Sequence, residues 1–265
     1  MYSAIPFVKA HGCGNDFLMI DAKYADGQFA AFTRHLCDRN RGVGADGVEW
    51  LFPSKESDIM IRLFNADGSE AELSGNGTRC VAAHLASKSD KKVFLIETAA
   101  GVKACTLVSR DGNLYQFSAR MGVPQVRKGL TLQHKDRTVS GLEINIGNPH
   151  FVVLGPIPED WKSLGAVITN HPHFREGTNI EFATMTGNNE VTFSIYERGV
   201  GPTTSSGTGS CATATAVITM GLAQSPVTVK AEGGAQKVYW QNELVLEGPA
   251  EIVCGGEYWP AVRSE

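Results

Sequence analysis

Short runs in which apolar and polar residues alternate cover most of the chain, and other runs place apolar residues three and four positions apart. Alternation is typical of strands that bury one face, whereas the longer spacing is typical of helices. The pattern predicts strands at 5–10, 17–21, 58–65, 93–97, 101–109, 114–121, 143–146, 151–154, 178–183, 191–196, 227–231, 237–240 and 244–247. It predicts helices at 30–39 and 161–168, and also in the apolar runs that begin at 81 and 212.

A short polar phrase occurs twice, each time directly before an apolar run. The copies are Ser74-Gly75-Asn76-Gly77 and Ser206-Gly207-Thr208-Gly209. Each is a serine, a Gly-x-Gly turn and then a helix, whose start presents unpaired N–H groups that bind carboxylate or phosphate. Two such starts suggest two half-sites for one small anion, with both serines touching it. The alternative is a pair of ordinary N-caps, and neither copy extends to a dinucleotide fingerprint or a Walker loop.

The order of strands, helix and strands occurs once on each side of the region 124–137. We therefore predict an α+β fold of two similar lobes, with 124–137 as the link between them. The N-terminal lobe is expected over 1–120, with the last strand, 255–265, as an optional addition, and the C-terminal lobe over 121–254. The two Gly-x-Gly loops would then meet at the cleft between the lobes, a common place for ligands.

Composition narrows the class of protein. The chain has 265 residues, of which 42% are hydrophobic and 20% charged, with a net charge of −4, as in soluble globular proteins. Nothing resembles the basic surface of a nucleic-acid binder. No apolar stretch is long enough to span a membrane, and residues 1–12 lack the pattern of a signal peptide, so we expect a cytoplasmic protein.

The six cysteines contain no C-x-x-C pair, which argues against a zinc ribbon or a dithiol redox motif. Reduced thiols are the expectation in the cytoplasm. Because His, Cys, Asp and Glu form no cluster with ligand spacing, we expect no metal, and we expect no other cofactor.

Asparagines stand at the ends of predicted strands beside glycine or proline. These are Asn65, Asn148 and Asn179. Singly, such residues are usually turn residues, but together with Arg198 they form a donor set suited to a carboxylate. Glu197 would pair with an ammonium group, or else form a solvated couple with Arg198 that contributes little.

Five motifs resemble the diaminopimelate epimerase family. They are His11-Gly12-x-Gly14-Asn15-Asp16-Phe17, Gly42-Val43-Gly44-Ala45-Asp46-Gly47, Asn65-Ala66-Asp67-Gly68-Ser69-Glu70-Ala71-Glu72, Gly147-Asn148-Pro149-His150 and Glu197-Arg198-Gly199-x-Gly201. They follow the family's order over most of the chain. The resemblance implies two pseudo-symmetric lobes, each a mostly antiparallel sheet wrapped on a central helix, with the active site in the cleft between them. It also implies a cytoplasmic, cofactor-free homodimer, independent of pyridoxal phosphate, that inverts an amino acid α-carbon.

The resemblance also implies roles for residues. In the family two cysteines flank the α-carbon, one removing its proton and the other delivering one to the opposite face; the matching positions here are Ser74 and Ser206. The reacting carboxylate would bind the backbone N–H groups of Gly75, Asn76, Gly207 and Thr208. The distal amino acid end would bind Asn15, Asn65, Asn148, Asn179, Glu197 and Arg198.

The two serines are a departure from the family. A thiolate is accessible near neutral pH, whereas a hydroxyl is several pKa units less acidic and needs a partner base. A second departure is Pro202, where the family usually has glutamate. Cys80 and Cys211 lie along the two helices and fit small buried residues better than catalytic ones, and Cys13 is the better outside candidate. His150 would orient Asn148 or titrate near the site, and the alternative is a packed, hydrogen-bonded loop residue.

Three functions compete. The leading hypothesis is a diaminopimelate epimerase that interconverts LL and meso forms for lysine and cell-wall synthesis, with the serine pair either natural or an engineered replacement of cysteine. The second is another isomerase of this fold that acts on a more acidic carbon. The third is a diaminopimelate-binding protein whose catalytic pair has lapsed.

Overall fold

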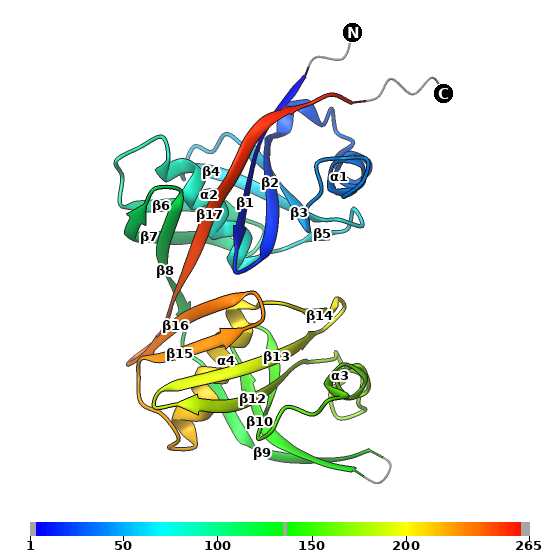
Figure 1. Ribbon diagram of the computed structural model, residues 1–265, viewed down its shortest axis with the longest axis vertical. Coiled ribbons are helices and arrows are strands. Elements are labelled where there is room, and N and C mark those ends of the chain that lie inside the picture. The colour runs from blue at the N-terminus through cyan, green and yellow to red at the C-terminus, as the bar shows by residue number, and fades with distance from the viewer. Residues whose placement is uncertain (1–3, 135–136, 261–265) are drawn as a thin grey trace. The chain divides into compact units, whose positions relative to one another are not determined.

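The computed structural model describes residues 4–134 and 137–260, which fold as two compact units. Of these residues, the first unit contains 4–119 and 249–260, and the second contains 120–134 and 137–248. The chain thus returns to the first unit at Pro249, whereas the sequence-based division placed that return at 255. Each unit combines antiparallel strand pairs with two helices, which confirms the predicted α+β class (Figure 1).

The first unit is a sheet that encloses one helix and carries a second helix outside. Its helices are α1 (Phe29–Cys37) and α2 (Gly75–Ala86), with a 3-10 turn at Ala22–Tyr24. Its strands are β1 (Ile5–Gly12), β2 (Asn15–Asp21), β3 (Gly47–Phe52), β4 (Ile59–Asn65), β5 (Glu70–Ala71), β6 (Val93–Thr98), β7 (Gly101–Asp111) and β8 (Leu114–Gly122), whose end enters the second unit.

The second unit follows the same plan. Its helices are α3 (Trp161–Ile168) and α4 (Gly207–Thr219). Its strands are β9 (Gln125–His134), β10 (Arg137–Asn145), β11 (Pro149–Leu154), β12 (Asn179–Gly187), β13 (Glu190–Glu197), β14 (Gly201–Thr203), β15 (Val227–Ala231), β16 (Gly234–Trp240) and β17 (Leu244–Tyr258), whose second half belongs to the first unit.

Strand pairing repeats from unit to unit. In the first, β1 pairs antiparallel with β2, β2 parallel with β3, β3 antiparallel with β4, and β4 parallel with β6. In the second, β10, β11, β12, β13 and β15 pair in the same order and the same directions. The structure therefore confirms the predicted internal duplication.

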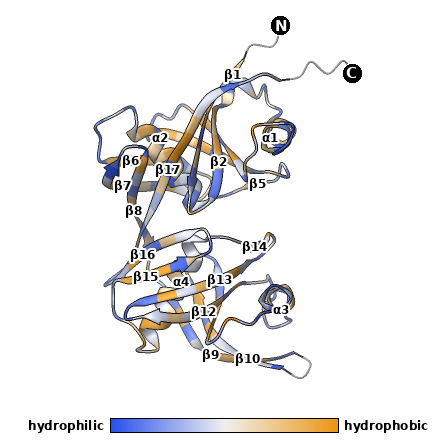
Figure 2. Ribbon diagram, viewed as in Figure 1, coloured by the Kyte–Doolittle hydropathy of each residue, from blue (hydrophilic) through white to orange (hydrophobic). Residues whose placement is uncertain are grey.

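The central helices α2 and α4 are buried on nearly all sides, because their residues are small. Ala82, Ala83, Ala212 and Ala214 are completely buried among the strands of their own units. A helix that is buried all round needs no amphipathic stripe, which explains why composition signalled these helices better than spacing. In contrast, α1 and α3 bury one face against the outer side of a sheet. Figure 2 shows hydrophobic and hydrophilic stretches alternating along the strands of both units.

The expectation of a link at 124–137 is wrong for the residues that the structure describes. Gln125–His134 is strand β9, which pairs antiparallel with β10, and residues 135–136 lie outside the described part. Leu130 and Leu132 alternate toward the core, and Leu132 is 4% exposed. The basic residues around them obscured this period of two in the sequence.

Candidate functional site

Ser74 and Ser206 are the N-cap residues of the two central helices. Both have extended backbone, and their Oγ atoms accept hydrogen bonds from the N–H groups of Gly77 (3.1 Å) and Gly209 (3.2 Å). The N-cap interpretation is therefore correct for both. Capping uses only the N–H of the third helical residue, so the first two N–H groups of each helix lack an intrahelical partner and suit an anion.

In the first unit, Asn15 lies beside the start of α2. Its Nδ2 donates to Asp46 Oδ2 (2.9 Å), and its Oδ1 accepts from Asn76 Nδ2 (3.3 Å). Asn76 in turn accepts a hydrogen bond from the buried guanidinium of Arg79. The structure therefore joins two predicted binding residues, Asn15 and Asn76, in one network.

Charged residues fix Asp46, the acceptor for Asn15. Arg39 donates to both Asp16 and Asp46 at 2.8 Å, and Lys9 Nζ lies 2.9 Å from Asp16. Burial acts to raise the pKa of Asp16, but the hydrogen bonds and charges of Arg39 and Lys9 outweigh it and lower this pKa to about 2. Asn65 lies at the end of β4, where its side chain donates to Ser69 Oγ (3.0 Å) and the next residue, Ala66, donates its N–H to the carbonyl of Asp46 (2.9 Å).

In the second unit, a hydrogen-bonded chain leads from the start of α4 into the interior. Asn148 Nδ2 donates to Thr208 Oγ1 (3.4 Å), and Asn148 Oδ1 lies 3.0 Å from Nε2 of His150. His150 Nδ1 lies 2.6 Å from Oε1 of Glu181, and both side chains are fully buried. Burial raises the pKa of Glu181, and the contact with His150 partly opposes this. The expectation that His150 orients Asn148 agrees with this contact.

Asn179 and Arg198 form a second contact in this unit. Asn179 Oδ1 accepts the backbone N–H of Arg198 (2.9 Å), and its Nδ2 donates to the carbonyl of Pro149 (3.0 Å). The Arg198 guanidinium donates to the carbonyl of Glu176 (3.0 Å). Among the described residues no ion pair within 4 Å joins it to Glu197.

Glu197 accepts a hydrogen bond from Thr203 Oγ1 (2.5 Å). Burial raises the pKa of Glu197, and Thr203 lowers it by a smaller amount. Glu197 is therefore a partly hidden carboxyl rather than half of a solvated couple with Arg198.

Two buried acids, Glu49 and Glu181, were missed by sequence reasoning. Both are 0% exposed. Each is the single charged residue in an otherwise apolar run, in Val48-Glu49-Trp50 and Ile180-Glu181-Phe182. A charge in such a run is costly to bury, and that signal could have drawn attention to them.

Cys80 and Cys211 take the buried positions expected from the sequence, and Cys13, the outside candidate for substrate contact, is buried as well. Cys80 and Cys211 are completely buried in the cores around α2 and α4, and burial raises the pKa of Cys80 far above its usual range. Cys13 is 3% exposed and has a left-handed φ of 52°. These are the surroundings of packing residues rather than of reactive thiolates.

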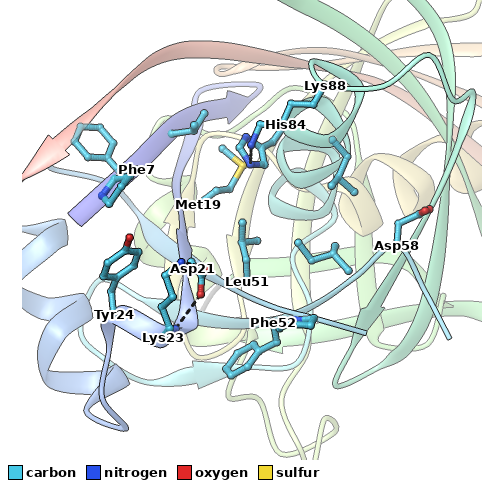
Figure 3. A pocket seen from close by; sticks show the side chains of 15 residues that line it. Phe7, Met19, Asp21, Lys23, Tyr24, Leu51, Phe52, Asp58, His84 and Lys88 are labelled. Carbon is cyan, nitrogen blue, oxygen red and sulfur yellow. Dashed lines mark hydrogen bonds and ion pairs between the residues drawn. The ribbon is translucent and has the colours of Figure 1, made fainter. Parts of the chain in front are cut away.

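A cavity of about 500 Å³ lies in the first unit, away from the start of α2 (Figure 3). Its walls come from β1, β2, β3 and the end of α2, and include Phe7, Met19, Leu51, His84 and Lys88. None of the predicted site residues lines it. Burial lowers the pKa of His84 to about 4, and Lys88 Nζ lies 3.0 Å from its Nε2.

Over residues 4–134 and 137–260, no group of three or more His, Cys, Asp or Glu side chains is placed to hold a metal ion. No helix in that part of the chain is long and apolar enough to cross a membrane.

Comparison with known proteins matches this chain to one family along most of its length. The family model for diaminopimelate epimerase matches residues 7–126 and 143–253. The diaminopimelate epimerase of Pelotomaculum thermopropionicum is 36% identical over 276 residues, covering 95% of this chain and 98% of the relative. That of Sphingopyxis alaskensis is also 36% identical, covering 95% and 96%.

Solved structures share the fold at much lower identity. A PhzF-family phenazine biosynthesis protein of Bacillus anthracis superposes with a TM-score of 0.71 at 16% identity, covering 96% of this chain and 99% of that one. A hydroxyproline epimerase of Agrobacterium vitis, with bound trans-4-hydroxy-L-proline, superposes with a TM-score of 0.70 at 14% identity, covering 96% and 90%. These likenesses concern the fold alone.

Proposed function

Because the chain belongs to the diaminopimelate epimerase family, we propose that it interconverts the LL and meso forms of diaminopimelate by moving the proton of one α-carbon. The observation that carries the proposal is the matched pair of helix starts. Ser74 and Ser206 cap α2 and α4 with the same hydrogen bond to the third helical residue. A two-base inversion requires two acid–base groups, and the two serines occupy equivalent positions, one in each unit.

The reacting carboxylate would bind the N–H groups that the caps leave unused. These belong to Gly75 and Asn76 on α2 and to Gly207 and Thr208 on α4. The partial positive charge of a helix start also stabilises the negative charge that develops on the substrate when its α-proton leaves.

The distal amino acid end of the substrate would bind the polar residues described above. They are Asn15, Asn65, Asn148, Asn179, Glu197 and Arg198. The hydrogen bonds that hold these residues in place before substrate binds support this part of the proposal. A side chain that is already fixed loses little conformational entropy when it binds a ligand. Glu197 would accept the distal ammonium group, and Arg198 and the asparagines would bind the distal carboxylate.

In the chemical step, Ser74 and Ser206 would act on opposite faces of the α-carbon. One removes the proton, and the other delivers a proton to the carbanion. We further propose that the reaction needs no pyridoxal phosphate or other cofactor. A cytoplasmic location, a homodimer and a role in lysine and peptidoglycan precursor synthesis follow from the family resemblance and belong to the same proposal.

Incubation with LL-diaminopimelate in heavy water tests this function, with proton NMR following the α-hydrogen and separation of isomers following the meso form. We expect α-hydrogen exchange together with epimer formation. Ser74→Asn and Ser206→Asn are the matched variants, because asparagine caps a helix as well as serine does but cannot move the proton. Each should retain binding and lose epimerisation.

The other outcomes separate the competing functions. Tight calorimetric binding without exchange would replace the epimerase with a binding protein. Neither binding nor exchange would point to another isomerase substrate.

A further inference from the structure

Each serine of the pair has a buried glutamate beside it, contributed by a strand of the same unit. Glu49 is in the middle of β3, where side chains alternate between the two faces of the strand. Val48 and Trp50 pack into the core beneath α1. Glu49 therefore points to the other face, toward α2, and it is 0% exposed.

Close packing at Gly77 places Glu49 next to the start of α2. A Cβ on Gly77 would collide with Glu49 Oε1, and the same point lies 3.3 Å from the Cβ of Ser74. The carboxyl group and the serine thus both lie close to one point beside the helical Gly77. Only glycine allows this approach, because any side chain there would occupy the place of the carboxyl oxygen.

The second unit repeats the arrangement. A Cβ on Gly209 would lie 3.1 Å from Glu181 Oε1 and 3.1 Å from the Cβ of Ser206. Glu181 is in β12, at the position that corresponds to Glu49 in β3, and it is also 0% exposed. The recurrence of serine, glycine and buried glutamate in both units argues against chance packing.

The two carboxyl groups retain unused hydrogen-bonding capacity. Both oxygens of Glu49 and Oε2 of Glu181 have no hydrogen-bond partner. Leaving a buried carboxyl without partners is costly, and such a group in a folded protein calls for an explanation. Nothing in the capping hydrogen bonds uses the hydroxyl protons of Ser74 and Ser206, since both Oγ atoms act there as acceptors.

We propose that Glu49 accepts and returns the hydroxyl proton of Ser74, and that Glu181 does the same for Ser206. This inference rests on the proposed function and supplies the partner base that a serine needs in place of a thiol. The two glutamates are positioning residues that act through the serines. Hydrogen bonds of this kind are often long in a ligand-free enzyme and shorten when substrate binds.

The proton transfers balance. On one face of the substrate, the Cα–H bond breaks as its proton moves to Ser74 Oγ, while the hydroxyl proton of Ser74 moves to the Glu49 carboxylate. The electron pair of the broken bond stays on the substrate. On the other face, Ser206 gives its hydroxyl proton to Cα and takes the proton of the neutral Glu181 carboxyl. The reverse reaction exchanges these roles.

Burial fits the two acids for this exchange. It raises the pKa of Glu49 to about 8 and also raises that of Glu181, and an acid or base works best with a pKa near the working pH. The titratable neighbour of Glu49 on α2 is Cys80, whose own pKa is raised by burial, so it stays neutral. Glu181 differs from Glu49 in its contact with His150.

The test combines two substitutions in a cycle. Glu49→Gln should lower α-hydrogen exchange by about a hundredfold or more, the usual contribution of a general acid or base. Glu56→Gln, at an exposed position in the same unit, should leave it unchanged. In a Ser74→Cys background Glu49→Gln should change exchange only slightly, because a thiol ionises without a partner. An equal loss in both backgrounds would mean a purely structural role and would overturn the proposal.

A readout without turnover separates this inference from the proposed function. In protein labelled with ¹³C at the glutamate carboxyls, the Glu49 signal should titrate near pH 8 and shift in Ser74→Ala. The pairing is overturned if the Glu49 signal titrates at the pKa of an ordinary glutamate, or if Ser74→Ala leaves its titration unchanged. This holds even if the protein epimerises diaminopimelate. The expected titration in a protein without α-hydrogen exchange would leave the pairing standing and overturn the proposed function instead.

Discussion

The hydroxyls of Ser74 and Ser206 hold two helix starts in place and stand where the family resemblance implies thiols. As caps they are as good as any residue. In the proton-transfer role that we propose for them they would be weaker than cysteines, because a thiol has a pKa near 8.5 that a helix start lowers further, whereas a hydroxyl stays protonated. Having serine in place of cysteine should therefore slow the reaction without destabilising the helix.

Restoring sulfur should show this directly. The double variant Ser74→Cys/Ser206→Cys is expected to raise epimerisation of LL-diaminopimelate by orders of magnitude, measured as meso product formed and α-deuterium incorporated in heavy water. Calorimetric binding of substrate is the control and should change little. A double variant that binds substrate yet stays inert would rule out the epimerase.

Glu49 should make stability depend on pH in a direction opposite to that of most carboxyls. Burial raises its pKa from 4.5 to about 8. Between these values the unfolded chain loses the proton first, so stability falls as pH rises through this window. Glu49→Gln removes that loss, on the order of 1.4 kcal/mol for each unit by which the pKa differs. Denaturant unfolding should therefore show that the free energy of unfolding of Glu49→Gln, relative to that of the unsubstituted protein, is higher at pH 8 than at pH 5. Glu56→Gln is the control. If the two proteins differ in unfolding free energy by the same amount at pH 5 and at pH 8, the pKa of Glu49 is not raised.

At the scale of elements, the sequence predicted the helices and strands whose hydrophobic residues recur with the spacing that their buried face requires. The helix expected at 161–168 is α3 (Trp161–Ile168), and both Gly-x-Gly phrases begin helices as expected. The strand β3 was missed because Val48, Glu49 and Trp50 are all buried. A strand covered on both faces does not alternate.

Some residues of the candidate site could likewise be identified from the sequence, and others could not. The duplicated phrase and the family motifs identify the serines and the asparagines as candidates from the sequence alone. The motifs do not include Glu49 and Glu181. A single charge in an apolar run marks both as unusual, but their proposed role depends on which helical residue lies beside each. That contact joins β3 to α2 and β12 to α4, and no local period encodes it.

The close approach of Gly77 to Glu49 predicts a specific sensitivity in α2. Gly77→Ala should destabilise the protein by about 1–3 kcal/mol, because the new methyl group collides with Oε1. Gly75→Ala, two residues earlier, is the matched control, since its Cβ would meet only Arg79 Nη1 at 3.9 Å. Adding Glu49→Ala to Gly77→Ala should reduce the cost. Equal effects of the two glycine substitutions in thermal unfolding would show that helix propensity, not the carboxyl, sets them.

At the scale of the whole molecule, each unit completes its sheet with a strand that pairs beside the first strand of the repeat. In the second unit β9 fills this place against β10, directly before it in the chain. In the first unit the second half of β17 pairs antiparallel with β1, from Ile5 opposite Tyr258 to His11 opposite Glu251. The first unit therefore depends on residues that follow the whole second unit in the sequence.

Deleting residues 249–265 should consequently unfold parts of the first unit and spare the second. The deletion removes every partner of β1 on that side and takes Ala250 from the core. It also deprives Nε of the buried Arg79 of its acceptor, the carbonyl of Pro249. A buried donor without its partner costs about 1–3 kcal/mol. Hydrogen exchange followed by mass spectrometry should show lost protection in β1 and retained protection in β12 and β13. Deleting only residues 259–265, which follow the end of β17, is the control and should leave β1 protected. If β1 stays protected after the longer deletion, pairing with β17 contributes little to the first unit, and its core alone holds the strand in place.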